Sequence, residues 1–579
     1  MKNSRLYLLL FFLFVFCQLS YAQTPDVTID GKGSRQVEPS IRLTLSPQII
    51  DTVKPSAVAS YPLLVYLYPT QIRLNPIKAA EIETTEKLRQ LYPFYAKIGM
   101  GSGVMPLGQF IYNSTRSKGY QYGVKVDHIS SFAKIKDRNS VVYAPANYDR
   151  TRAVLYGKIV DNTYMINGEI NYLNHGFHYY GIPSDTIDKT FISQRFQRIG
   201  TNIGYVSDFG DSAVMNYAVD FGYHFLQTAL PFADTLMPDE WRTAEHNAKL
   251  NIKGWYKYKS EEFYANMGMR LNNYRFGVED SIVSLPLDSG RVRSNTIIDF
   301  KPGVLTQLMD NRFKLDLGFS MALDIAEEIK FFIYPQAEIK YSLFNDIFIP
   351  FAGIRGGLSQ NSFSALSQTN QFLAPSVKLI NENNPYDIYG GIKGTLSKRM
   401  GFNVNVSFKK ITNKAFFVTD TLTVYRNKFG VIYDTLNHTR IETSLFYQLD
   451  EKLKIDGLAR YNSYETLNEA YAWNLPVLEF KLRAAYNLFD KFMFNLDGHI
   501  ETGRKALVYE MFEDVQEIDD QYYMNLGSIV DFNLGISYRY NKRVTAFLEF
   551  NNILSQRYNN WYNYPVQPIQ IMGGVSFRF

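Results

Sequence analysis

The stretch that decides the fold lies near the C-terminal end, where residues 532–540 read FNLGISYRY, followed by NKR at 541–543 and VTAFLEFN at 544–551. Successive side chains of a strand point to opposite faces, so every second residue shares a face. One face of the first strand would carry Phe532, Leu534, Ile536, Tyr538 and Tyr540. The other would carry Asn533, Ser537 and Arg539. The stretch therefore predicts a β-hairpin with one apolar and one polar face.

The same pattern recurs back to about residue 95, and the connections alternate between short and long. Short polar turns occur, for example, at 161–163, 310–312, 489–491 and 541–543. Between them lie pairs of strands whose other connection is usually long and polar, as at 130–150, 359–384, 419–439 and 502–528. A soluble sandwich is the alternative, but this asymmetry is typical of outer-membrane barrels. Counting the turns, with an early one at 115–118, predicts an all-β fold, a transmembrane antiparallel β-barrel of about 22 strands.

Composition agrees with a barrel and excludes other classes. The chain has 43 Tyr and 42 Phe but only 4 Trp and 7 His, a bias that aromatic girdles around a polar lumen would produce. After the N-terminal segment no apolar run is long enough for a membrane-spanning helix. The net charge of +5 is small and not clustered, which argues against a nucleic-acid partner.

The N-terminus predicts export. A basic start, the apolar run 6–16 and the small residues of SYA at 20–22 indicate a signal peptide over 1–22, cleaved between Ala22 and Gln23. The single cysteine, Cys17, lies inside this segment, so the mature chain can form no disulfide.

The last strand also carries an expected signal. Residues 569–579 place Val575, Phe577 and the terminal Phe579 on one face. A final strand that ends on an aromatic residue resembles the signal by which outer-membrane proteins are handed to the barrel assembly machinery. We therefore predict that machinery as a partner during biogenesis, and outer-membrane lipid as the surroundings of the mature barrel.

The polar strand faces should line the lumen. The predicted lumen-lining residues are Lys454, Asp456, Arg460, Glu479, Lys481, Arg483, Asp497 and Glu549. They carry both signs of charge, so neighbours on adjacent strands can pair and also hold water. No substrate can be read from them.

Few residues suggest metal or catalytic chemistry. His175 and His178 form a weak pair without nearby acidic or cysteine ligands, and are expected to be loop histidines. The acidic run within 510–520 lacks the spacing of a calcium loop and is expected to be solvated. His499 beside Asp497 has no obvious serine partner. We therefore predict no enzyme, no catalytic residue, no metal site and no cofactor.

Two passages near the C-terminus, together with size and strand count, carry a family resemblance. NNILSQRY at 551–558 and VSFRF at 575–579 resemble the end of a TonB-dependent receptor barrel. The Tyr- and Asn-rich passages YNLFD at 486–490 and YNYP at 562–565 are typical of Bacteroidetes proteins. The resemblance implies a barrel over 95–579, located in the outer membrane of a Gram-negative bacterium, that takes part in transport.

The chain departs from that family before the barrel. Receptors of this kind begin with a globular plug that fills the lumen, whereas residues 23–94 are roughly half of what a plug occupies and are rich in proline. They are predicted to be a short periplasmic or luminal extension, either a reduced plug or a partner-binding segment. A barrel of this size needs a filled lumen. The filling would come from this extension, from inward-folded loops such as 359–384 and 502–528, or from a partner.

Two functions follow from these alternatives. In the first, the chain is a receptor-like outer-membrane transporter. In the second, it is a non-transporting subunit of an outer-membrane assembly, secretion or surface-lipoprotein complex, with a periplasmic or surface lipoprotein as the partner that fills the lumen.

Overall fold

The computed structural model describes residues 91–117, 119–207, 214–229, 242–276, 292–421, 423–509, 516–518 and 521–579. The chain separates into two compact units, 1–86 and 87–579, and all described residues belong to the second. The predicted signal peptide, its cleavage site and nearly all of the N-terminal extension lie outside the described residues.

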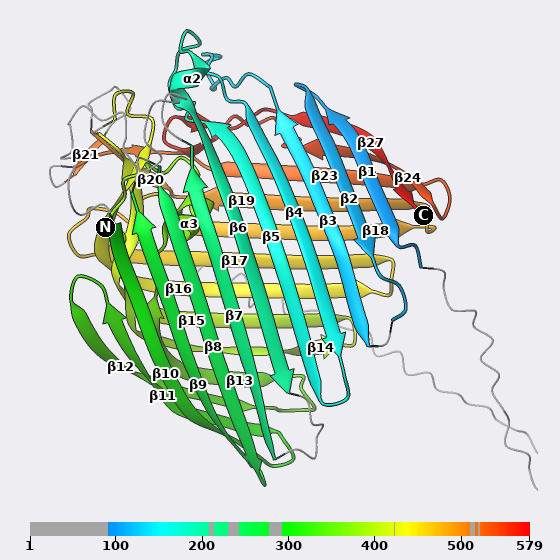
Figure 1. Ribbon diagram of the computed structural model, residues 1–579, viewed down its shortest axis with the longest axis vertical. Helices are drawn as coiled ribbons and strands as arrows, with labels where there is room; N and C mark the ends of the chain where they lie inside the picture. Colours follow the sequence, from blue (N-terminus) through cyan, green and yellow to red (C-terminus); the bar gives the residue numbers. More distant parts are fainter. Residues whose placement is uncertain are drawn as a thin grey trace, which may run out of the picture. The chain divides into compact units, whose positions relative to one another are not determined.

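The second unit is a closed antiparallel barrel of 22 strands, as predicted from the turns (Figure 1). The barrel strands are β1 (Phe94–Gly101), β2 (Met105–Asn113), β3 (Tyr120–Ser131), β4 (Tyr148–Val160), β5 (Tyr164–His178), β6 (Ser193–Ser207), β7 (Met215–Thr228), β8 (Ala244–Tyr258), β9 (Glu261–Arg275), β10 (Val292–Leu308), β11 (Phe313–Ile325), β12 (Ile329–Tyr341), β13 (Ile349–Ser359), β14 (Glu382–Ser397), β15 (Met400–Thr419), β16 (Phe429–Leu449), β17 (Leu453–Thr466), β18 (Leu478–Leu488), β19 (Phe492–Thr502), β23 (Ile529–Arg539), β24 (Val544–Asn551) and β27 (Gln570–Arg578).

The barrel closes where its first and last strands meet. β1 pairs with β27 from Tyr95 opposite Arg578 to Gly101 opposite Met572. The backbone amides of Phe94 and Phe579 each donate to the other's carbonyl, at 3.0 and 3.1 Å, and their rings stack with centroids 5.2 Å apart. Closure leaves no unpaired strand edge, which a sheet surrounded by lipid cannot tolerate.

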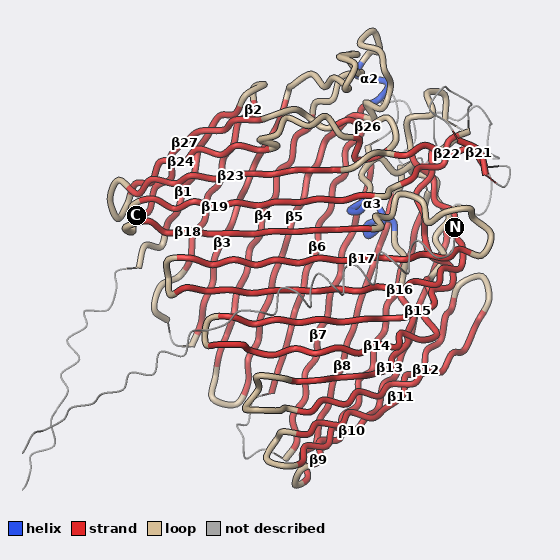
Figure 2. Tube along the Cα trace, turned by 180° about the vertical axis from the view of Figure 1, so that it is seen from behind, coloured by secondary structure: helices blue, strands red, loops and turns tan. Residues whose placement is uncertain are grey.

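The two ends of the barrel differ in their connections. The end that carries Phe94 and Phe579, called the inner end here, has tight turns in which residues adopt left-handed backbone angles, such as Phe489 and Asp490 with φ of 55°. At the opposite, outer end the connections are mostly long. Several hold short elements: α2 (Lys189–Ile192), α3 (Phe363–Thr369), β20 (Lys505–Val508), β21 (Gln516–Ile518), β22 (Gln521–Asn525), β25 (Asn559–Trp561) and β26 (Tyr564–Pro565). Figure 2 shows both small helices at or within the outer part of the barrel.

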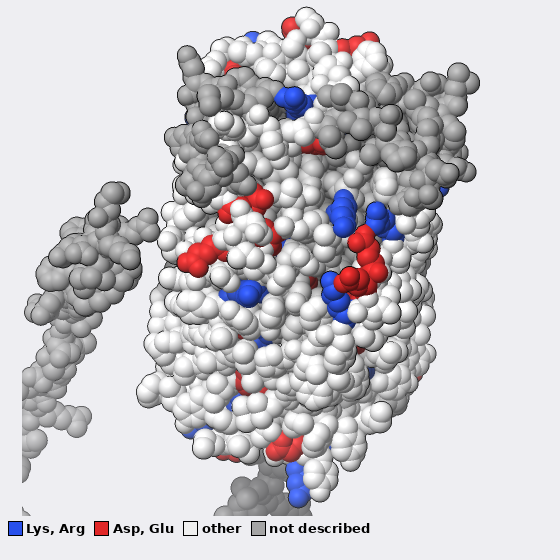
Figure 3. Space-filling view, turned by 90° about the vertical axis from the view of Figure 1, so that its left-hand side faces the viewer, with Lys and Arg blue, Asp and Glu red and all other residues white. Residues whose placement is uncertain are grey.

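The outward face is apolar, as the alternation requires. On β27 the outward side chains Ile571 and Phe577 are exposed, while the intervening Met572 and Ser576 are buried. On one face of the molecule, the visible basic and acidic side chains lie side by side in small groups on an otherwise uncharged surface (Figure 3). In the described part of the chain, no helix is long and apolar enough to cross a membrane.

The assignment of outward and inward faces can be tested on β6. There Ile203 points outward and is 49% exposed, while its neighbour Asn202 faces the lumen. We expect Ile203→Arg to lower the free energy of unfolding in lipid vesicles by about 2–4 kcal/mol, because the charge would enter hydrocarbon. Asn202→Arg places the same charge in the lumen and should cost much less. Denaturant titration measures both, and equal losses would contradict the assigned faces.

Candidate functional site: the barrel lumen

Ion pairs link neighbouring strands along the inner wall. Arg460 on β17 donates through Nε to Glu442 on β16 at 2.5 Å, and its Nη1 lies 3.5 Å from Glu479 on β18. Lys481 is 3.8 Å from the same Glu479. At the closure, Lys97 on β1 pairs with Glu549 on β24 at 2.7 Å, across the intervening strand β27. The wall is therefore a polar surface of paired charges.

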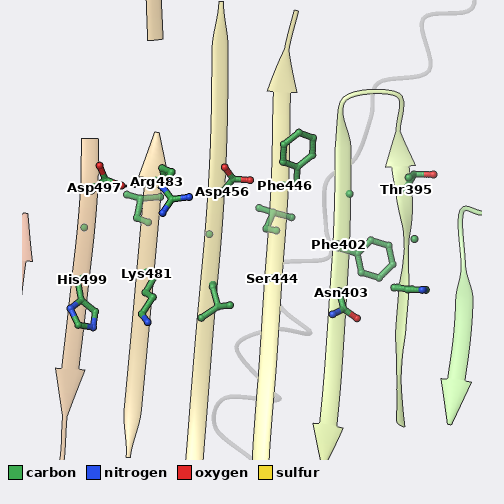
Figure 4. Close-up of a pocket in the computed structure, with 18 of the residues that line it drawn as sticks. Thr395, Phe402, Asn403, Ser444, Phe446, Asp456, Lys481, Arg483, Asp497 and His499 are labelled. Atoms are coloured by element: carbon green, nitrogen blue, oxygen red, sulfur yellow. Dashed lines mark hydrogen bonds and ion pairs between the residues drawn. The ribbon is translucent and has the colours of Figure 1, made fainter. Parts of the chain in front are cut away.

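The inner half of the lumen contains a cavity of about 990 Å³, lined by residues from β13 to β23. Figure 4 shows its charged side chains on neighbouring strands, with Arg483 beside Asp497 and Lys481 beside His499. Arg483 donates through Nε to Asp497 at 3.1 Å. Asp456 lies next to Arg483 in the strand register. This cavity could hold water and a polar solute.

The predicted lumen-lining residues fall into two groups. Those that line the cavity are Asp456, Lys481, Arg483 and Asp497. Those that lie elsewhere are Arg460, Glu479 and Glu549, held in the ion pairs above, and the exposed Lys454.

The outer half of the lumen is occupied by residues 360–381, the connection between β13 and β14, called the lumen segment here. It contains α3, which starts at Phe363 with Ser362 as its N-cap. The Phe363 ring packs against Phe196 on β6 and Tyr274 on β9, at centroid distances of 5.8 and 5.6 Å. Figure 2 shows α3 among the strands of the barrel.

Its other end meets the outer extension of the β15–β16 hairpin. Leu373 forms a parallel bridge with Phe429, the first residue of β16. The Ala374 amide donates to the Phe429 carbonyl at 2.8 Å, and the Phe429 amide donates to that of Phe372 at 2.9 Å. Phe429 belongs to the outer extension of the β15–β16 hairpin, beyond the residues of β16 that pair with β17. The adjoining Pro375 carbonyl accepts from the Tyr274 hydroxyl on β9 at 2.7 Å, so the segment lies between this extension and the wall at β9. Residues 359–384, one of the alternatives considered for filling the lumen, thus fold inward.

A buried carboxylate fixes the start of α3. Glu245, on the inward face of β8, is 0% exposed. Its two oxygens accept from the backbone amides of Phe363 and Ser364, each at 2.7 Å. These amides belong to the first turn of the helix, where they have no partner within it. Burying this carboxylate is tolerable because it is hydrogen-bonded.

A network of buried amide side chains holds the two ends of the lumen segment, near residues 360 and 381, to the wall. Asn247, Asn272 and Asn295, on β8, β9 and β10, donate one to the next at 3.2 and 2.9 Å. Asn295 also donates to Asn381 of the lumen segment at 2.7 Å, and Asn381 to Asp324 on β11 at 2.7 Å. The network is closed by Gln360, Asn361 and the backbone of the segment. Four adjacent strands therefore hold one side of it.

Aromatic residues of the outer connections cover the segment. Phe372 stacks on Tyr564 with centroids 3.8 Å apart, and Tyr180 meets both rings edge-on. Tyr179 donates its hydroxyl to the Leu373 carbonyl at 3.1 Å. Burial raises the pKa of Tyr180, so its phenol stays neutral in this apolar cluster. Side chains from three places in the chain thus pack together at the outer end.

Residues 502–528, the other loop considered for filling the lumen, pack at a different place. Its described residues form a small sheet of β20, β21 and β22 at the outer end. Leu507 packs in a cluster with Trp473, and Lys505 lies over the rings of Tyr471 and Tyr523 at 3.2 and 4.9 Å. It therefore packs on the β17–β18 connection.

The expectation that His175 and His178 are loop histidines is wrong, because both lie within β5, and they do not form a joint site. His178 shares a hydrogen bond of 2.7 Å with the Asn147 carbonyl, while the His175 ring packs against Phe177. Among the residues that the structure describes, no group of three His, Cys, Asp or Glu side chains is placed to hold a metal. The acidic run within 510–520 lies largely outside the described residues.

Sequence reasoning missed Glu245 and the asparagine network. A signal existed, since Glu245, Asn247, Asn272 and Asn295 all sit near the outer ends of predicted strands. Their meeting depends on the register between strands, which alternation alone does not give.

Comparison with known proteins supports the fold. No known family model matches the sequence, and no protein of curated function matches it either. The solved structures of similar fold include the siderophore receptor PirA from Acinetobacter baumannii, with 10% identity, coverage of 85% of this chain and 81% of that one, and a TM-score of 0.62. The FrpB iron transporter from Neisseria meningitidis has 10% identity, coverage of 85% and 82%, and a TM-score of 0.61. The copper transporter OprC has 11% identity, coverage of 85% and 82%, and a TM-score of 0.58.

At such low identity the likeness establishes the fold. The closed wall, the apolar outer belt and these structures define the class, an outer-membrane β-barrel. More narrowly, it has the 22-stranded barrel of the TonB-dependent receptors, as predicted. The missing plug and the Bacteroidetes source stay predictions.

The anchor of α3 can be tested by Glu245→Ala. The change leaves the amides of Phe363 and Ser364 without their acceptor, which costs about 1–3 kcal/mol for each buried group. We expect the lumen segment to loosen and the conductance in planar bilayers to rise. Glu328→Ala, which removes an exposed carboxylate from the β11–β12 turn, is the control. Equal conductance of the two variants would show that Glu245 does not hold the segment.

Proposed function

We propose that this chain is an outer-membrane transporter that carries a small solute through its lumen and that its lumen segment moves to open the path. The observation that supports this proposal is that the segment lies in the outer half of the lumen and is held to β8 and β10 by hydrogen bonds from wall side chains to its backbone amides and to Asn381. Such bonds exchange with water at a net cost of only about 1 kcal/mol each. Polar groups on both the segment and the wall tolerate water when they part.

The fold supports import as the direction. The solved structures with this barrel are described as a siderophore receptor, an iron transporter and a copper transporter. We infer that the present barrel also takes up a small solute. After the segment moves, the solute would next enter the charged cavity of the inner half, which is lined by Arg483, Asp497 and Lys481.

The remaining sequence-based assignments complete the proposal. Residues 1–22 would be removed on export, with cleavage between Ala22 and Gln23. Residues 23–94 would act as a reduced plug or bind a partner. Val575, Phe577 and Phe579 would be read by the assembly machinery before β27 pairs with β1.

The alternative, a subunit of a larger outer-membrane complex, is less favoured. The main argument for a complex was that a partner would be needed to fill the lumen. The chain's own residues 360–381 occupy the outer half, which weakens that argument. Purification in mild detergent separates the two functions. A stoichiometric lipoprotein partner that stays bound would favour the complex, while the transporter is expected as the barrel alone.

The role of the lumen segment as a permeability barrier can be tested in cells by replacing residues 363–377 with a short Gly-Ser linker. We expect sensitivity to large antibiotics that normally do not cross the outer membrane, because the outer half of the lumen opens. Replacing residues 183–190, which lie in the largely exposed connection with α2, is the matched control and should leave resistance unchanged.

A parallel variant without residues 24–92 shows whether the extension also closes the barrel. Antibiotic resistance equal to wild type after the 363–377 replacement, with the barrel present at normal levels, would exclude the segment as the barrier.

A further inference from the structure

A second cavity, of about 370 Å³, lies between α3 and the inner wall formed by β4 to β7. The wall supplies Arg150 from β4, His175 from β5, and Arg198 from β6. In the strand register Arg150 lies directly opposite His175. The lumen segment supplies the hydroxyl and amide side chains of Ser364, Ser367, Gln368, Thr369 and Gln371. The cavity is of the size that small-molecule sites have, about 300–1,000 Å³.

The charge of this cavity is uniformly positive. Among its lining residues in the described part of the chain, two carry guanidinium groups and none is Asp or Glu. The nearest acidic residue along β4, Asp149, points to the opposite face of the wall, where it is bound through both oxygens by Arg195 at 2.7 and 2.8 Å. Glu245 is committed to the amides of α3.

Arg198 has unused hydrogen-bonding capacity. Its Nη1 makes one long contact of 3.5 Å with the Ser364 hydroxyl, and its buried Nε has no partner. A guanidinium carries five N–H donors in a fork that fits a carboxylate or a phosphate. The terminal N–H groups of Arg198, which make only that one contact, are the donors that an anion in the cavity can accept from.

Aromatic rings complete the lining. Phe196, Phe372 and Trp561 lie around the cavity, the last from β25 in the outer connection before β27. Rings beside hydroxyl and amide side chains suit a ligand that has apolar ring faces and hydroxyl groups at its edges.

We propose that this cavity binds an anionic sugar, that is, a monosaccharide bearing a carboxylate or a phosphate, with Arg198 and Arg150 on the anionic group. Inorganic phosphate leaves the rings unused, and a neutral sugar leaves the guanidinium groups unpaired. The headgroup of a membrane lipid is excluded by position, because the residues belong to the lumen face and the wall separates them from the bilayer. The site goes beyond the proposed transport, since binding requires no passage.

Isothermal titration of the full chain in detergent tests the site. Galacturonate and glucose 6-phosphate are the probes, with galactose, glucose and inorganic phosphate as comparisons. We expect at least one anionic sugar to bind at least tenfold more tightly than its neutral counterpart and than phosphate. Arg198→Gln should weaken that binding about tenfold or more, because it removes charged hydrogen bonds.

Lys158→Gln is the matched control, because it removes one positive charge from the inner end of the same strand as Arg150 and should leave affinity unchanged. Equal binding of neutral and anionic sugars, equal loss in both variants, or no binding of any probe would overturn the proposal. Phosphate binding as tightly as the sugars would overturn its sugar part. The titration measures affinity in detergent and requires no transport. A failed transport test would therefore not change the conclusion about binding.

Discussion

Every backbone amide and carbonyl of this wall needs a partner, because hydrocarbon offers none. The pairing of β1 with β27 meets that requirement for the last two free edges. Once the sheet is closed, each strand has one face to lipid and one to the lumen, and alternation follows from geometry. Pairs such as Ile203 outside and Asn202 inside express this rule residue by residue.

A wall one side chain thick has no core between two layers, so its packed interior must come from the lumen. The largest cluster of buried apolar residues accordingly joins wall residues such as Phe196 and Tyr274 to Phe363 and Leu373 of the lumen segment. On the neighbouring strands the contact is polar, through Glu245 and the asparagine network. The segment is thus packed on one part of its surface and hydrogen-bonded on another.

The wall could be predicted from sequence because alternation and turn lengths are local. The hairpin over 532–551 already contains both, and counting its repeats gave the observed number of strands. The sequence alone offered several candidates for the part that fills the lumen, and residues 359–384 were one of them. The roles of Glu245 and Asn295 depend on which residues face each other across four strands and one distant connection. Register and loop direction are set by the whole sheet, and no single stretch records them.

A thin closed sheet has little resistance to flattening, since its cross-section can change from round to oval with only small changes at each strand pair. The lumen segment links β8 to β10 with the outer extension of the β15–β16 hairpin. While it is attached at both ends, it ties this extension to these strands near the outer rim. Detaching one end would therefore do more than clear space, because it would also release the described outer connections that pack on the segment, those of Tyr180 and Tyr564.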